Sequence, residues 1–193
     1  MRFDEIAEIQ LGKMAHPDNR RSATPLPYLR NANVQWGRFN LEDVTKMDFD
    51  EEERVKFALR AGDLIVCEGG EPGRAAVWDG QIAECYFQKA LFRIRPFENR
   101  ADARFLFFRL WYGGLTGEFQ NSNAVTTISH LPRVRLCQLM LPVPSIDDQR
   151  RIAAALAHRT DAVHCMTSRV RDELAAIEAL PAALLREAFQ GNN

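Results

Sequence analysis

The fold is decided by residues 145–189, SIDDQRRIAAALAHRTDAVHCMTSRVRDELAAIEALPAALLREAF, which read as one long amphipathic helix. Pro142 and Pro144 end the segment before it, and Ser145 is a suitable N-cap. Pro181 removes one helical hydrogen bond, so we expect a kink or a break there. The sequence therefore predicts a globular domain over residues 1–144 and a helical region over residues 145–193.

Apolar residues recur along this helix with the seven-residue spacing that is typical of a coiled coil. One series steps by seven from Leu156, and a second series lies three residues after each position of the first. Arg159 and Glu173 are polar interruptions of the second series. The residues expected to form this helix seam are Ile152, Leu156, Arg159, Val163, Met166, Val170, Glu173, Ile177 and Leu180.

The seam needs a partner, and the sequence contains no second helix of comparable length. It must face the globular part, another protein or a second copy of the chain. A homodimer is the simplest of these solutions. In an antiparallel pair, Arg159 would meet Ile177 of the second copy one turn from that copy's Glu173, so a cross-dimer ion pair is expected.

Composition narrows the class of protein. With 193 residues and 46% hydrophobic content, the chain can bury one sizeable core. It has no run of about 18 apolar residues and no basic-then-apolar leader, so we expect no membrane span, no signal peptide and a cytoplasmic location. Four widely spaced cysteines, with no C-x-x-C pair, argue against a zinc site or disulfides and predict four buried, reduced thiols.

Charge is informative through its distribution, because the net charge is only −1. Five acids gather over residues 48–53, and we expect a short acidic helix over residues 50–59 with the acidic cluster on a solvated face. The sequence GKMAHPDNRRSATPLP, residues 12–27, is basic and punctuated by proline. It suits a loop that lays Lys13, Arg20 and Arg21 on phosphates while Asn19 reaches a base edge, although a merely solvated loop has the same composition.

The remaining elements indicate a mixed, strand-rich α+β domain. An apolar helix is expected over residues 103–112, capped by Asp102, and a glycine-rich reversal over residues 68–74. Strands are expected at residues 3–11 (at a sheet edge), 28–34, 64–67, 75–78, 90–95 and 134–141. In the strand at residues 90–95, Arg93 and Arg95 would point outward, either to phosphates or to solvent.

Signatures of catalysis are missing. The glycine reversal is not a phosphate loop, because G-x-x-x-x-G-K-[ST] is absent, and no G-x-G-x-x-G follows a strand. The four histidines fit no triad, and Glu68 lacks the lysine that a metal-dependent nuclease would place after it. We therefore expect a binding protein with no cofactor and no metal.

Six strings resemble, in order, the target-recognition half of type I restriction-modification specificity subunits. They are LGK (11–13), PYLRNANVQWG (27–37), LRAGDLIVCEGG (59–70), YFQKALFRIRP (86–96), TTISHL (126–131) and LPVPSIDDQRRIAAAL (141–156). The resemblance implies a non-catalytic subunit. That subunit places an adenine methyltransferase, and through it a translocating nuclease subunit, on a bipartite DNA sequence.

Members of that family usually carry two recognition domains and two long helices, which pair antiparallel as a spacer. This chain has one of each and so resembles a half-subunit. Two copies would rebuild a full subunit with two-fold symmetry, and the target would be an interrupted palindrome. The helix from 145 to 180 would span roughly 50 Å, which separates two half-sites by more than one turn of duplex.

The resemblance also assigns residues. DNA contacts are expected from Lys13, Asn19, Arg20, Arg21, Arg30, Asn31, Asn33, Arg74, Tyr86, Gln88 and Lys89. Contacts with the methyltransferase are expected from Gln149, Arg150 and Arg151, which could equally be ordinary surface residues of a first helical turn.

Three other functions stay open at this point. The chain could be the specificity part of a system in which methyltransferase and nuclease are fused in one polypeptide. A stand-alone DNA-cleaving enzyme would cut with magnesium and no partner. A dimeric protein-interaction scaffold would ignore DNA altogether.

Overall fold

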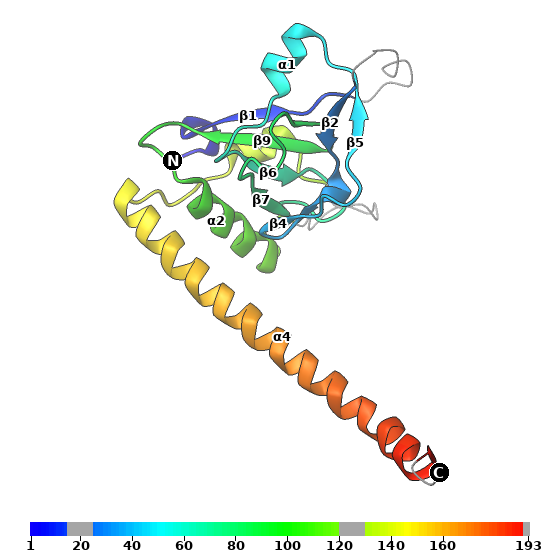
Figure 1. The fold of residues 1–193 in the computed structure, drawn as a ribbon. Coiled ribbons are helices and arrows are strands. Elements are labelled where there is room, and N and C mark those ends of the chain that lie inside the picture. The colour runs from blue at the N-terminus through cyan, green and yellow to red at the C-terminus, as the bar shows by residue number, and fades with distance from the viewer. Residues whose placement is uncertain (15–24, 120–129, 191–193) are drawn as a thin grey trace. The chain divides into compact units, whose positions relative to one another are not determined.

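The computed structural model describes residues 1–14, 25–119 and 130–190 (Figure 1). Two compact units divide the chain, Met1–Ala153 and Ala154–Asn193. The elements in chain order are η1 (Phe3–Glu5), β1 (Ala7–Leu11), β2 (Leu26–Leu29), η2 (Asn31–Asn33), β3 (Val34–Gln35), β4 (Arg38–Phe39), β5 (Thr45–Met47), α1 (Glu51–Phe57), β6 (Leu64–Cys67), β7 (Ala75–Val77), β8 (Tyr86–Phe87), β9 (Leu91–Pro96), α2 (Ala103–Leu115), α3 (Arg133–Gln138) and α4 (Ile146–Gln190). The predicted α+β class with a long C-terminal helix is confirmed.

A four-stranded antiparallel sheet forms the centre of the first unit, with the strand order β1-β9-β6-β7. Strand β1 is its edge, as expected, although it starts at Ala7 because residues 3–5 form a 3-10 turn. Side chains of β6 alternate between two apolar cores, with Leu64 and Val66 in one core and Ile65 and Cys67 in the other. Helices α1 and α2 lie on opposite sides of this sheet (Figure 1).

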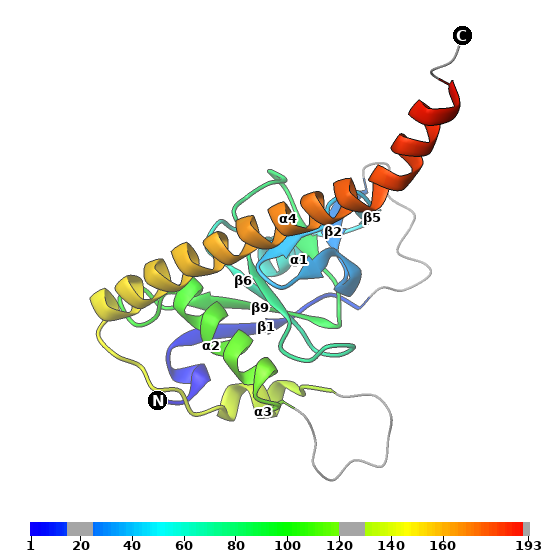
Figure 2. The same cartoon turned by 90° about the horizontal axis from the view of Figure 1, so that it is seen from below.

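Helices α2 and α3 cover the first core. Asp102 caps α2 as predicted, because its carboxylate accepts a hydrogen bond from the Phe105 amide at 2.9 Å. The strand expected at residues 134–141 is wrong, since residues 133–138 form helix α3 beside α2 (Figure 2). A short apolar run fits either structure, and the helical form buries Leu136 while it leaves Val134 exposed.

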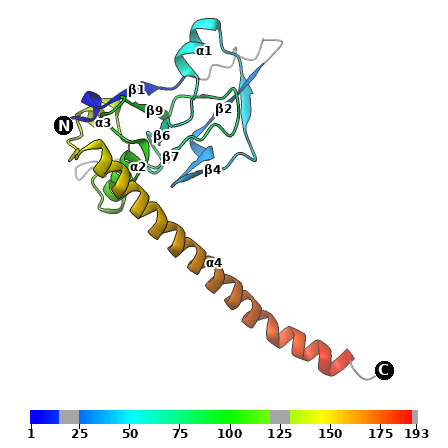
Figure 3. The ribbon, with the colours of Figure 1, turned by 60° about the vertical axis from the view of Figure 1, so that its left-hand side comes forward.

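The second core lies under α1 and a small sheet of order β5-β2-β8, in which β2 and β8 run parallel. Asp50 caps α1, as its carboxylate accepts from the Glu53 amide at 2.8 Å. The strand expected over residues 28–34 ends at Leu29, because the Asn33 side chain accepts from the Arg30 amide and closes a 3-10 turn. A turn at Trp36 joins β3 to β4, and β4 lies near β7 (Figure 3).

Neither expectation for the arginines of β9 fits the structure. Arg93 is 3% exposed and donates to the carbonyls of Lys56 and Ala58, both at 2.9 Å. Arg95 forms a two-point ion pair with buried Asp63 at 2.7 Å. These arginines tie the segment between α1 and β6 to the sheet, so they face neither a phosphate nor open solvent.

Helix α4 continues through Pro181, so the break expected there does not occur. Ser145 caps α4 as predicted, with its hydroxyl accepting from the Asp148 amide at 3.2 Å. The prediction of four buried thiols is wrong for Cys137, which is half-buried, and for Cys165, which is exposed on α4. Across the described residues no helix has both the length and the apolar content needed to cross a membrane.

Candidate nucleic-acid interface

Two turns that are far apart in the sequence meet at one end of the central sheet. One is the 3-10 turn η2, and the other is the glycine reversal between β6 and β7. The side-chain amide of Asn31 donates to the Gly69 carbonyl at 2.8 Å. Arg74 donates through Nη2 to the Asn31 carbonyl at 3.1 Å and to Asn31 Oδ1 at 2.6 Å. Two residues that the sequence analysis selected separately, Asn31 and Arg74, are therefore in direct contact.

The segment between β8 and β9 joins the same end of the sheet. The Gln88 amide donates to the Leu29 carbonyl at 3.1 Å, and the Glu68 amide donates to the Ala90 carbonyl at 3.0 Å. Lys89 is exposed and Gln88 is half-buried. Their side chains form no hydrogen bond with any residue that the structure describes. We define the recognition edge as Asn31, Gly69, Gly70, Arg74, Gln88 and Lys89.

Backbone approaches closely at the glycines of the recognition edge. Gly69 pairs with His130 in an isolated bridge, and a Cβ at Gly69 would lie 3.1 Å from His130 Cε1. Gly70 has φ +79°, which side-chain-bearing residues rarely adopt. From the sequence, His130 was weighed only as a possible catalytic residue. It lies at this edge because the Leu131 amide donates to the Glu68 carbonyl at 2.7 Å.

Trp36 and Glu71 also belong to this region, although the sequence analysis assigned them no role. The Trp36 indole donates to Glu71 Oε1, and the other oxygen of Glu71 accepts from Arg74 Nη1 at 3.3 Å. Trp36 is held by α2, where its ring stacks on Trp111 with 6.0 Å between ring centroids. Only the position of Glu71 within the glycine reversal could have drawn attention to it.

The Arg74 guanidinium affects the pKa of a buried thiol inside the domain. Burial raises the pKa of the Cys67 thiol to about 11, while the nearby Arg74 guanidinium acts in the opposite direction. Cys67 is fully buried at the end of β6, directly before the reversal. The Arg74 side chain is 16% exposed and bonded to Asn31, so it lies against the domain instead of extending into solvent.

Three predicted DNA contacts are buried and bonded within the domain. Lys13 donates to the Asp48 carbonyl at 2.8 Å and forms an ion pair with Glu53. Asn33 donates to the Asn40 carbonyl at 2.9 Å. Tyr86 stacks on Phe49, with ring centroids 4.2 Å apart. In this structure Lys13, Asn33 and Tyr86 position the loops that carry the recognition edge, because their polar groups already have partners inside the domain.

The other predicted DNA contacts have different positions. Arg30 donates to the Asp43 carboxylate at 2.6 Å, a surface ion pair that leaves the guanidinium partly exposed. Asn19, Arg20 and Arg21 lie outside the described residues.

Gln149 differs from the two arginines that follow it. It is fully buried, accepts from the Asp102 amide at 3.0 Å, and donates to the carbonyls of Arg100 at 3.1 Å and Pro144 at 3.0 Å. A buried side chain of this kind offers nothing to a partner protein. Arg150 and Arg151 are exposed and form i,i+3 ion pairs with Asp147 and Asp148.

The predicted helix seam is largely exposed. Ile152 is the exception, because it packs against the first core of the domain. Apolar members of the seam on the rest of α4 are 36–66% exposed, namely Leu156, Val163, Met166, Val170, Ile177 and Leu180. An apolar row of this length on one helix is typical of a surface that another helix covers.

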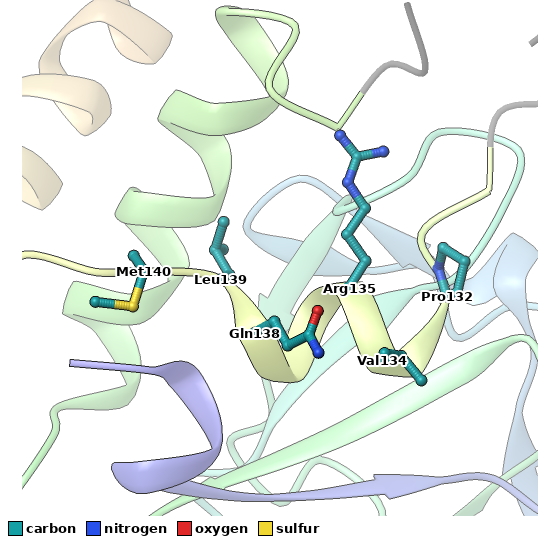
Figure 4. A pocket seen from close by; sticks show the side chains of 6 residues that line it. All are labelled: Pro132, Val134, Arg135, Gln138, Leu139 and Met140. Atoms are coloured by element: carbon teal, nitrogen blue, oxygen red, sulfur yellow. The ribbon is translucent and has the colours of Figure 1, made fainter. Parts of the chain in front are cut away.

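Elsewhere on the domain an open hollow of about 420 Å³ follows α3 (Figure 4). Pro132, Val134, Gln138, Leu139 and Met140 line it together with Arg135. Its lining carries no acid and no histidine. Among the described residues no cluster of histidine, cysteine and acidic side chains could hold a metal ion.

Comparison with a family model gives a match over residues 1–174, and the model describes a type I restriction modification DNA specificity domain. No curated protein sequence matches. Three solved structures have similar folds. One comes from work on complex assembly and conformational transition of the type I R-M system, with a TM-score of 0.77 and 20% identity over 100% of this chain and 46% of that chain.

The second structure is the HsdS subunit from Thermoanaerobacter tengcongensis, with a TM-score of 0.67 and 19% identity over 100% of this chain and 45% of that one. The third is the type I restriction-modification S subunit from M. genitalium, with a TM-score of 0.56 and 16% identity over 99% and 47%. The chain thus spans less than half the length of each solved structure.

Proposed function

Because this chain belongs to the family of type I restriction modification DNA specificity domains, we propose that its recognition edge reads one half of a bipartite DNA site. The family match over residues 1–174 is the observation that carries the proposal. Its local support is the cluster of Asn31, Arg74, Gln88 and Lys89 on turns at one end of the sheet. Binding loops held by a rigid scaffold are the common arrangement for such sites.

Each side chain at the edge has a chemical role in this proposal. The side-chain amide of Gln88 has no hydrogen-bond partner among the described residues, and such an amide pairs bidentately with adenine N6 and N7. Arg74 suits guanine or a phosphate, and Lys89 suits a phosphate. Asn19, Arg20 and Arg21 remain proposed contacts on chemical grounds alone. Arg30 remains one as well, once it separates from Asp43.

The subunit itself is non-catalytic in this proposal. It positions an adenine methyltransferase subunit and, through the complex, a translocating nuclease on the recognised DNA, in the cytoplasm. Arg150 and Arg151 are proposed contacts for the methyltransferase, since both are exposed beside the start of α4. Gln149 acts only by fixing that start.

Two copies of the chain form the working unit in this proposal. The exposed seam of α4 supports an antiparallel homodimer, because each helix would cover the apolar row of the other. Helix α4 has 45 residues and is about 68 Å long at 1.5 Å per residue. Two-fold symmetry then gives an interrupted palindromic target, with half-sites that need not adjoin.

Mapping of methylated adenines tests this function directly. Genomic DNA is sequenced from cells that express an adenine methyltransferase subunit of the same system with this chain, without it, or with its Gln88→Ala variant. We expect an interrupted palindrome to be methylated only in the presence of the chain, with altered or relaxed sequence at one base of each half-site for Gln88→Ala.

The other outcomes separate the alternatives. An asymmetric motif would contradict the symmetric homodimer but not the adaptor role. An unchanged methylation map, together with no binding of the purified chain to duplex DNA at low salt, would favour the protein-interaction scaffold. DNA cleavage by the purified chain with magnesium alone would contradict the non-catalytic role.

A further inference from the structure

Glu71 lies beside Arg74, one of the two cations of the recognition edge. Arg74 is itself held by hydrogen bonds to the two oxygens of Asn31. Arg74 Nη1 lies 3.3 Å from the Glu71 carboxylate, whereas Arg95 and Arg109 lie 2.7 Å from their carboxylate partners. Charge-assisted hydrogen bonds are usually 2.7–2.9 Å long, so the contact with Glu71 is a loose one. The Glu71 side chain is 53% exposed, and solvent weakens the pair further.

The carboxylate is nevertheless held in position. Its second oxygen accepts a hydrogen bond from the Trp36 indole, and that ring is stacked on Trp111 of α2 and tilted against Phe107. Glu71 is thereby fixed beside Arg74 by a residue from a different turn. A solvated glutamate on a mobile turn would have no such anchor.

We propose that Glu71 is a specificity-determining residue that competes with DNA for Arg74. The inference rests on the proposed DNA-reading function. A free arginine at the edge would bind the phosphates of any duplex, which raises affinity without discrimination. A fixed carboxylate repels phosphate and, together with the two oxygens of Asn31, retains Arg74, so only DNA that offers the edge further correct contacts displaces it.

Glu71→Gln isolates the charge, because the glutamine carbonyl still accepts from the Trp36 indole. Glu98→Gln is the matched control. It causes the same change in net charge. Glu98 lies two residues after Pro96, and Pro96 pairs with Ala7 at the end of β1 and β9 that is opposite to the recognition edge. Binding of each full-length variant is measured by fluorescence anisotropy at several salt concentrations. The probes are a duplex with the motif found by methylation mapping and a scrambled duplex of equal length.

We expect Glu71→Gln to bind the scrambled duplex roughly fivefold more tightly, with the ratio of motif to scrambled affinity falling by a similar factor. Glu98→Gln should change both affinities less than about twofold. An unchanged ratio in Glu71→Gln would overturn the inference. If the unmodified chain bound neither duplex, the proposed function itself would fail.

Trp36→Phe separates charge from packing. It keeps a ring against α2 but removes the indole N–H, so Glu71 keeps its charge and loses its anchor. We expect a smaller loss of discrimination than in Glu71→Gln, with thermal unfolding of Glu71→Gln unchanged. If Trp36→Phe reproduced the full effect and Glu71→Gln unfolded at a lower temperature, Glu71 would have a packing role only.

Discussion

At the scale of single residues, burial separates side chains that position the site from those that are free to bind. Gln149 and Arg150 are neighbours in sequence, yet Gln149 is fully buried while Arg150 is exposed. Two of the three hydrogen bonds of Gln149 join the first turn of α4 to the segment before α2, and the third reaches the Pro144 carbonyl directly before α4. Removing them would leave part-buried backbone groups of Asp102, Arg100 and Pro144 without partners.

Gln149→Ala should therefore lower the free energy of unfolding of the domain by about 2–3 kcal/mol, since the variant loses three hydrogen bonds and leaves part-buried backbone groups without partners. Arg150→Ala is the control, and its effect should stay within about 0.5 kcal/mol because the side chain is on the surface. Urea unfolding followed by tryptophan fluorescence measures both. Equal stability of the two variants would argue that Gln149 does not hold the helix start.

At the scale of elements, the exposed row on α4 departs from a strict heptad. Val163, Met166, Val170, Leu174 and Ile177 follow one another in steps of three, four, four and three residues, and Leu174 is 53% exposed. The seven-residue register instead places Glu173 on the seam. The four steps still add up to two heptads, but the order of the three- and four-residue steps reverses after Val170, which places the apolar Leu174 on the row in place of Glu173.

Leu174→Ala should therefore weaken the proposed homodimer by about tenfold or more, whereas Glu173→Ala should change it less than about threefold. Sedimentation equilibrium of the full chain gives the dimer dissociation constant, starting from a 22.0 kDa monomer. A larger effect of Glu173→Ala than of Leu174→Ala on the dissociation constant would favour the strict seven-residue register. If the unmodified chain stayed monomeric at every concentration measured, the proposed homodimer would be contradicted.

At the scale of the whole molecule, stability should fall at alkaline pH through two buried thiols. Burial raises the pKa of Cys67 to about 11 and that of Cys85 to about 12, from 9.0. Above pH 9 the unfolded chain ionises these thiols while the folded chain keeps them protonated. Ionisation therefore favours unfolding, and the stability that is present below pH 9 is lost as the pH rises toward 11.

We expect the free energy of unfolding to drop by roughly 2–4 kcal/mol between pH 8 and pH 10.5 from these two groups. Cys85→Ala should abolish about half of that drop, and Cys165→Ser, which changes an exposed thiol, should leave it intact. Denaturant unfolding at both pH values provides the measurement. An identical drop in all three proteins would assign the alkaline loss to other groups.

Local signals explain which features were predictable. Ser145, Asp50 and Asp102 mark the starts of three helices, because a cap acts on the turn that follows it. The apolar run of β6 and the long apolar row on α4 could also be predicted, since each is a pattern within one element. These features, with the ordered family strings, were enough for the α+β fold, the helical arm and the family.

Tertiary structure alone decided which polar side chains remain available. Lys13, Arg93 and Gln149 look like surface residues in the sequence, but their partners lie 40, 85 and 47 residues away and only folding brings them together. The contact of Arg74 with Asn31 likewise bridges 43 positions. Burial and hydrogen bonding are properties of the assembled chain. The framework and the family could therefore be recognised from local sequence patterns, whereas the candidate site depends on packing between distant segments.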